Sequence, residues 1–292
     1  MRVGLVQHAN SDNYRDNLNA SLRGIEQAAH QGAQLVLLQE LQTSLYFCKT
    51  EDPAHFELAE SIPGPTTNEL AEIARKLGVV IVGSVFERRA PGLYHNTAVV
   101  LDTDGCLAGI YRKMHIPDDP GYYEKFYFTP GDLGFKPIET SLGKLGVLVC
   151  WDQWFPEAAR LMALSDAQLL LYPTAIGWDP QDTREEQARQ FDAWRIIQRA
   201  HAIANGLPVL CCNRVGLERD PSDAGRNAQF WGGSFVCGAQ GEILAEAPTN
   251  DESILVTDID LARTARVRTI WPYFRDRRID AYEDLTRRYL DN

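Results

Sequence analysis

The sequence lacks the long apolar runs, the cysteine pairs and the leader that would place it in a membrane or outside the cell. No apolar stretch among its 292 residues approaches the roughly 20 residues needed to span a bilayer. Residues 1–6 read as a strand and do not resemble a secretory leader. Six cysteines are too few for a disulfide framework in so long a chain, and none has the spacing of a zinc site. We therefore expect a cytoplasmic protein with reduced thiols and no metal site.

Positive charge is also scarce. The chain has 29 Lys and Arg against 40 Asp and Glu, a formal net charge of −11. A field of this sign repels nucleic acid and anionic membrane surfaces. We expect neither as a partner, whereas a small neutral or cationic molecule is easier to accommodate.

Several common catalytic and nucleotide-binding motifs are missing as well. The sequence contains no G-x-S-x-G turn, no Walker A loop, no G-x-G-x-x-G after a strand and no H-E-x-x-H helix. Their absence weighs against the enzyme classes that these motifs mark.

What the sequence does contain is an alternation of short apolar runs with longer segments of helical period, the pattern of an α/β protein. We expect strands at 2–7, 34–39, 79–86, 95–101, 107–111, 144–149, 168–172, 208–212, 233–237 and 243–246. We expect helices at 16–31, 67–77, 156–164 and 183–204. No Ser-, Gly- or Pro-rich linker separates the two similar αβ halves, so we predict a single domain over 1–292 with two sheets facing each other.

The segment 261–292, called the C-terminal arm below, is dense in arginine but also carries acids and aromatic residues. A nucleic-acid tail would carry the positive charge without the acids. The mixture favours an arm at a subunit contact, and hence a homo-oligomer.

Three reactive side chains, Glu40, Lys113 and Cys150, each follow an expected strand. Open α/β sheets place their ligand sites at the carboxyl ends of strands. Cys150 also precedes an expected helix, whose N-terminus would lower the pKa of the thiol. Plainer interpretations exist: a buried core cysteine, a solvated carboxylate at a strand end and a surface lysine. Position in the sequence alone does not decide between the catalytic interpretation and these plainer ones.

His115 lies closest in sequence to these residues among the six histidines. It could act as the base of a Cys–His pair. A hydrogen-bonded structural histidine is the favoured interpretation.

The flanks of the three residues make the sequence similar to the nitrilase superfamily of carbon–nitrogen hydrolases over nearly its whole length. The matching motifs are LQEL at 38–41, YRKMHIP at 111–117 and VLVCWD at 147–152. The resemblance implies a four-layer α-β-β-α sandwich with the site at one end of the paired sheets. It also implies a homodimer or larger assembly that uses a C-terminal arm.

Two further segments, PGYYEKFYF at 120–128 and CWDQWFPE at 150–157, resemble the branch that hydrolyses N-carbamoylputrescine in polyamine synthesis from arginine by way of agmatine. The products would be putrescine, CO₂ and ammonia, with no metal or organic cofactor. One alternative is a related enzyme that acts on a carbamoyl-β-amino acid, an aliphatic amide or a nitrile. Another is a non-catalytic scaffold with the same fold.

The resemblance also implies a role for each site residue. Cys150 would attack the ureido carbon and form a thioester, after Glu40 has taken the thiol proton. Lys113 and the backbone N–H of Trp151 would hold the developing oxyanion, and Glu124 would support Lys113.

The far end of such a substrate is an ammonium on a four-carbon chain, so we expect an apolar wall and an acid in the pocket. Candidates for the wall are Tyr46, Trp151 and Trp178. Candidates for the acid are Asp118, Asp119, Asp179 and Glu185.

Overall fold

The computed structural model describes residues 1–219 and 227–291. The first sheet contains β1 (Arg2–Gln7), β2 (Leu35–Leu38), β3 (Val80–Ala90), β4 (Leu93–Leu101), β5 (Leu107–Arg112) and β15 (Ser253–Asp258). The second contains β6 (Ile138–Thr140), β7 (Gly143–Val147), β8 (Leu169–Thr174), β10 (Val209–Asn213), β13 (Phe235–Cys237) and β14 (Ile243–Glu246). A small third sheet contains β9 (Gly177–Trp178), β11 (Val215–Glu218) and β12 (Ala228–Trp231).

The two large sheets repeat one arrangement. Their strand orders are β15-β1-β2-β3-β4-β5 and β14-β13-β10-β8-β7-β6. In each, three neighbouring strands run parallel, β1-β2-β3 in the first and β7-β8-β10 in the second. Parallel strands end at the same edge of a sheet, so each half of the chain delivers its strand ends to one edge.

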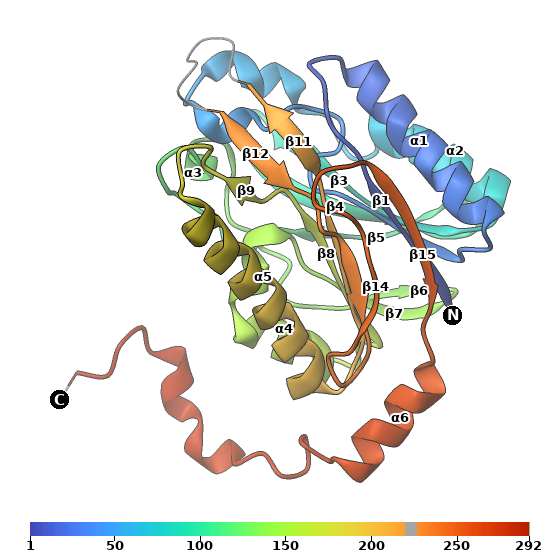
Figure 1. The fold of residues 1–292 in the computed structure, drawn as a ribbon, viewed down its shortest axis with the longest axis vertical. Helices are drawn as coiled ribbons and strands as arrows, with labels where there is room; N and C mark the ends of the chain where they lie inside the picture. Colours follow the sequence, from blue (N-terminus) through green and yellow to red (C-terminus); the bar gives the residue numbers. More distant parts are fainter. Residues whose placement is uncertain (220–226, 292) are drawn as a thin grey trace.

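Helices cover the outer faces of both sheets (Figure 1). The helices are α1 (Tyr14–His30), α2 (Pro65–Leu77), α3 (Glu124–Tyr127), α4 (Pro156–Leu164), α5 (Arg184–Asn205) and α6 (Leu261–Ile270). The pair α1 and α2 lies against the first sheet, and α4 and α5 lie against the second. Short 3₁₀ helices are η1 (Phe47–Lys49), η2 (Pro53–Leu58), η3 (Cys150–Trp154), η4 (Ile279–Ala281) and η5 (Glu283–Thr286). The predicted four-layer sandwich is confirmed.

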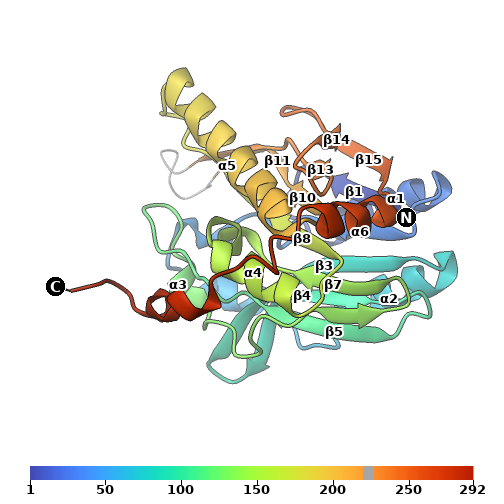
Figure 2. The same cartoon turned by 90° about the horizontal axis from the view of Figure 1, so that it is seen from below.

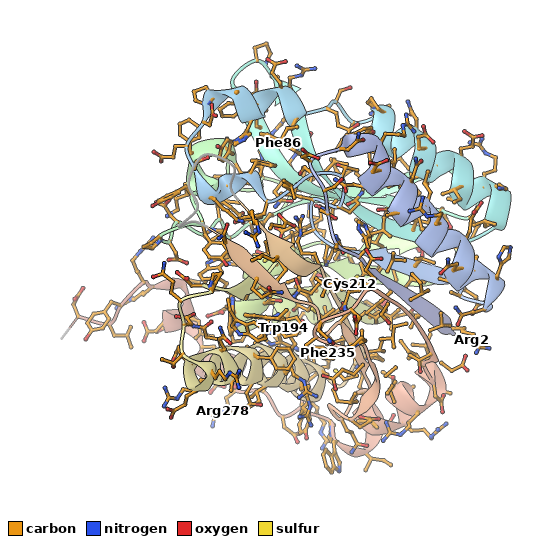
Figure 3. All side chains as sticks on the ribbon, turned by 45° about the horizontal axis from the view of Figure 1, so that its top comes forward. Arg2, Phe86, Trp194, Cys212, Phe235 and Arg278 are labelled. Carbon is orange, nitrogen blue, oxygen red and sulfur yellow. The ribbon has the colours of Figure 1, made fainter. Side chains whose placement is uncertain are left out.

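Successive side chains of the central strands point to opposite faces of the sheet, so each strand contributes to two layers of the core. Leu5 and Leu37 lie in the core between the two sheets, whereas their neighbours Val6 and Leu38 pack with helix residues such as Ile25. Both faces of β2 are therefore buried, which explains its unbroken apolar run. On the other side, Trp194 of α5 packs edge to face on Phe235 of β13, with ring centroids 5.6 Å apart (Figure 3).

All ten expected strands are present, but some differ in extent, and five further strands of the described chain were not expected. The strand expected at 79–86 continues to Ala90 and pairs with β4 across a tight turn at Gly92, whose φ is +75°. Glycine adopts this left-handed conformation without strain. The strands that were not predicted are β6, β9, β11, β12 and β15. Of these, β15 completes the first sheet by pairing antiparallel with β1.

The C-terminal arm begins with α6, and Phe274 beyond α6 still packs against the core and beneath Arg160 of α4. The end of the arm extends away from the sandwich (Figure 1, Figure 2). Large apolar side chains on it are exposed, among them Ile270, Trp271, Ile279, Leu285 and Tyr289.

Across residues 1–219 and 227–291, no helix combines the length and the apolar character that crossing a membrane demands.

Candidate active site

The structure brings Glu40, Lys113 and Cys150 together from both sheets. Glu40 lies two residues after β2, Lys113 follows β5, and Cys150 begins η3 beyond the end of β7. The ammonium of Lys113 donates to Oε1 of Glu40 at 2.8 Å, and the charges of both residues act on the thiol of Cys150. The strand-end positions read from the sequence thus converge on one point between the sheets.

Lys113 is buried between two carboxylates. Its Nζ donates to Glu40 and, at 2.7 Å, to Oε2 of Glu124, which begins α3. Burial alone would lower the pKa of Lys113, but the charges of Glu124 and Glu40 outweigh it and raise the pKa well above its usual value. The lysine is therefore a fixed cation at the base of the site.

The two carboxylate oxygens of Glu40 differ: one accepts two hydrogen bonds, and the other accepts none from the described residues. Oε1 accepts from Lys113 and, at 2.7 Å, from the amide of Asn96. Oε2 is buried, and no donor in the described part of the chain reaches it. A buried carboxylate oxygen without a partner is costly, so Oε2 is the atom of Glu40 that still has hydrogen-bonding capacity to offer.

Cys150 is held in a strained conformation at the strand end. Its φ is +43°, a region that residues other than glycine occupy rarely and mostly at functional sites. The side chain is 5% exposed, and Sγ lies 3.8 Å from the carbonyl oxygen of Ala175.

The pKa of the Cys150 thiol is shifted in the direction opposite to the one expected from the sequence. Burial and the charge of Glu40 raise the pKa of Cys150 well above its usual value, although Lys113 opposes them. The expected lowering by a helix N-terminus is therefore wrong, because desolvation and the neighbouring carboxylate outweigh it. The raised pKa keeps the resting thiol protonated.

Asp152 braces the turn that carries Cys150. One of its oxygens accepts from the N–H of Val149 at 3.0 Å and from the hydroxyl of Tyr111 at 2.8 Å. The other accepts from the N–H of His115 and bonds its Nδ1 at 2.7 Å. His115 is therefore a structural histidine, as favoured above, and it ties the segment after Lys113 to the cysteine turn.

Glu124 is fixed from two sides. Oε2 accepts from Lys113, and Oε1 accepts from the hydroxyl of Tyr46 at 2.8 Å. Burial, joined by the charge of Glu40 and opposed by Lys113, raises the pKa of Glu124 to about 7. Tyr46 thus acts on a site carboxylate, which places it differently from the substrate wall expected for it.

A cavity of about 410 Å³ opens beside Cys150. The residues that line it are Pro117, Asp119, Tyr122, Glu124, Cys150, Trp151, Trp154, Ala175, Ile176, Gly177, Gln190, Ala193 and Trp231. Of the three predicted wall residues, Trp151 lines this cavity. Tyr46 lines a neighbouring one of about 360 Å³, and the indole of Trp178 donates to the carbonyl of Gln187 and packs on Trp231.

The four candidate acids for the substrate ammonium lie in different surroundings. Asp119 lines the cavity, whereas Asp118 is exposed outside its lining. Asp179 accepts from the N–H of Gln181, and the exposed Glu185 pairs with an arginine one turn further along α5. Only Asp119 among the four lines the cavity.

Sequence reasoning missed Asn96 and Asp152. The available signal was a polar residue inside the apolar strand β4 for Asn96, and an acid two residues after the cysteine for Asp152. In residues 1–219 and 227–291, no group of three or more His, Cys, Asp or Glu side chains is arranged to hold a metal ion.

Comparison with known proteins shows the family of the chain. The family model described as carbon–nitrogen hydrolase matches residues 2–269. The N-carbamoylputrescine amidase of Arabidopsis thaliana is 44% identical, over 97% of this chain and 94% of the relative. The citrullinase of Francisella tularensis subsp. tularensis is 41% identical, over 99% of each chain. The crystal structure of a carbon–nitrogen hydrolase from Helicobacter pylori superposes with a TM-score of 0.96 at 53% identity, covering 99% of each chain.

Proposed function

The chain belongs to the carbon–nitrogen hydrolase family and is a hydrolase of carbon–nitrogen bonds, and we propose that it hydrolyses N-carbamoylputrescine to putrescine, CO₂ and ammonia. The observation that carries this choice is the charge of the cavity. Its only charged lining residues in the described chain are the acids Asp119 and Glu124. A cationic ureido amine suits such a lining, whereas a substrate bearing a carboxylate would meet like charge there.

The reaction begins with a proton transfer. Glu40 takes the thiol proton of Cys150 on its free Oε2, and Sγ forms a bond to the carbamoyl carbon while the carbonyl electron pair moves onto oxygen. Glu40 returns the proton to the leaving nitrogen as the C–N bond breaks, which leaves the acyl group on sulfur. Water activated by Glu40 then cleaves the thioester and restores the thiol. The carbamic acid released in this step breaks down to CO₂ and the remaining ammonia or putrescine, which accounts for all three products.

Negative charge on the carbonyl oxygen is met by fixed donors. The ammonium of Lys113 is already held between two carboxylates, and the backbone N–H of Trp151 lies in the first turn of η3. Donors fixed in advance do not have to reorganise as the charge develops. Glu124 keeps Lys113 in register and borders the cavity in which the substrate nitrogen lies.

The distal ammonium of the substrate is assigned to Asp119, and the four-carbon chain to the indole of Trp151. We expect Asp119→Asn to raise KM for N-carbamoylputrescine at least about tenfold, because a charged hydrogen bond contributes about 1.5–3 kcal/mol. The exposed neighbour Asp118 provides a matched control, since Asp118→Asn removes the same charge outside the cavity. Equal KM changes in the two variants would contradict the assignment.

A panel of substrates tests the proposed activity. Ammonia release is measured with N-carbamoylputrescine, a carbamoyl-β-amino acid, an aliphatic amide, a nitrile and citrulline. We expect the highest kcat/KM for the ureido amine. A preference for any other member would overturn the substrate assignment.

Citrulline is the second candidate, because the relative named citrullinase matches 99% of the chain. One feature of the cavity favours it: the indole N–H groups of Trp154 and Trp231 are buried and have no acceptor among the described residues. A substrate carboxylate could accept from them. The panel separates this candidate from the amine directly.

We also propose that the protein works as a homo-oligomer in the cytoplasm, in putrescine synthesis. The exposed apolar side chains of the C-terminal arm support an intermolecular contact. All six cysteines are free, and thiols persist in a reducing compartment. Light scattering should give a mass at least twice 32.8 kDa, falling to the monomer when 271–292 are deleted.

A further inference from the structure

Arg214, between β10 and β11, is fully buried and donates hydrogen bonds to the backbone that carries Glu40. Its Nη2 donates to the carbonyl oxygens of Glu40 at 2.7 Å and Leu41 at 2.9 Å. Its Nη1 donates to the carbonyl oxygen of Ser44 at 3.1 Å. One guanidinium therefore holds three carbonyl groups of a single turn.

That turn would not hold its shape unaided. Leu41 has a φ of +48°, a conformation that a leucine keeps only where its surroundings impose it. The carbonyl groups of Glu40 and Leu41 are buried with their residues, and buried carbonyls need donors. Arg214 supplies those donors at the residue whose carboxylate faces the nucleophile.

Glu218, at the end of β11, links the same guanidinium to the second carboxylate of the site. Its Oε1 accepts from Arg214 at 2.7 Å, and its Oε2 accepts from the backbone N–H of Tyr46 at 2.6 Å. The hydroxyl of Tyr46 in turn donates to Glu124. A chain of hydrogen bonds thus runs from Arg214 through Glu218 and Tyr46 to Glu124.

We propose that Arg214 and Glu218 form a positioning pair that sets both carboxylates flanking Lys113, Glu40 through its peptide group and Glu124 through Tyr46. The inference rests on the proposed role of Glu40 as base, not on the identity of the substrate. Stability alone is a weak reason for such a pair, because the cost of desolvating buried ions often cancels their attraction. Precise placement of the base is the stronger reason.

Two conservative variants test the pair. Arg214→Lys keeps the charge beside Glu218 but cannot reach all of its acceptors, and Glu218→Gln keeps the shape but not the charge. Because a displacement of about 1 Å can cost about 100-fold in rate, we expect kcat per folded molecule to fall about 100-fold and KM to change less than about twofold. Each variant is assayed on the substrate that wild type turns over best, so a wrong substrate assignment shows in wild type alone.

Arg268→Lys is the matched control. Arg268 also donates to two backbone carbonyls, those of Asn205 and Gly206, but at the end of α5 and outside the cavity lining. It should keep the wild-type kcat. If Arg214→Lys and Glu218→Gln keep wild-type kcat per folded molecule, or if neither folds while Arg268→Lys does, the pair is structural only and the proposal is overturned.

A double-mutant cycle gives a second readout. If Arg214 acts by placing the carboxylate of Glu40, adding Arg214→Lys to Glu40→Gln should lower the residual kcat by less than about threefold, since no base is left to misplace. A further fall of about 100-fold in that background would show that Arg214 acts independently of Glu40 and would overturn the part of the proposal that assigns Arg214 to the placement of Glu40.

Discussion

Replacing Glu40 with glutamine removes the proposed base while leaving its hydrogen bonds in place. The amide oxygen of Gln can occupy the position of Oε1, where Lys113 and Asn96 donate at 2.8 and 2.7 Å. The amide NH₂ then falls at Oε2, which has no donor to displace among the described residues. The variant should therefore fold, with a far-ultraviolet circular dichroism spectrum that matches wild type.

The expected loss follows from the state of the nucleophile. The pKa of Cys150 is raised well above its usual value by burial and by Glu40 itself, so near neutral pH the thiol stays protonated unless a base takes its proton. A positioned general base contributes about 10²–10⁴-fold, which corresponds to about 3–5 kcal/mol in the barrier. We expect kcat/KM of Glu40→Gln to fall by about 10³-fold.

The assay measures ammonia release from N-carbamoylputrescine across pH. Removing the charge of Glu40 also removes one cause of the raised pKa of Cys150, so the residual activity of the variant should rise with pH as thiolate forms without a base. Retention of more than about a tenth of wild-type kcat/KM near neutral pH would refute the reasoning. A residual activity that is flat from about pH 7 to about pH 10 would do the same.

The remaining predictions concern the other members of the site. Cys150→Ala should release no ammonia yet still bind N-carbamoylputrescine in calorimetry; turnover by this variant would exclude a thioester. Lys113→Met should lower kcat about 10²–10³-fold, since one oxyanion donor contributes on this scale, and it should retain the dichroism spectrum of wild type; unchanged kcat would remove the lysine from the mechanism. Because burial raises the pKa of Glu124 from 4.5 to about 7, the folded state holds an extra proton between these values. The contribution of Glu124 to the unfolding free energy should therefore fall as pH rises through that window, by about 3 kcal/mol at about 1.4 kcal/mol per pKa unit, while the buried His8, whose pKa is lowered to about 4 by burial, contributes in the opposite direction. In denaturant titrations the wild type should therefore lose stability relative to Glu124→Gln as pH rises through the window, and parallel pH curves for the two proteins would contradict the shift.

The sequence predicts the layers of this fold and the convergence of its three reactive residues. Runs such as residues 35–38 are apolar without interruption because both faces of the strand are covered. The places of Glu40, Lys113 and Cys150 follow from strand ends meeting at an edge. Local sequence pattern and simple strand topology are therefore sufficient to predict these features.

Contacts between residues far apart in the chain do not follow from local pattern. The raised pKa of Cys150 depends on burial and on a carboxylate 110 positions away in sequence. The hydroxyl of Tyr46 meets Glu124 rather than the main cavity. No sequence motif marks Arg214, because its proposed role depends on hydrogen bonds to three carbonyl groups near residue 40.

The pairing of β15 with β1 has a consequence for the synthesis of this chain on the ribosome. Arg2 is in register with Asp258, so the second strand of the pair is made about 250 residues after the first. At about 5–20 residues per second this delay is roughly 12–50 s. Throughout it β1 has an open edge, to which strands of other chains can pair. Yield in a producing cell should therefore depend on translation speed and chaperone supply, even for variants whose finished fold is as stable as wild type.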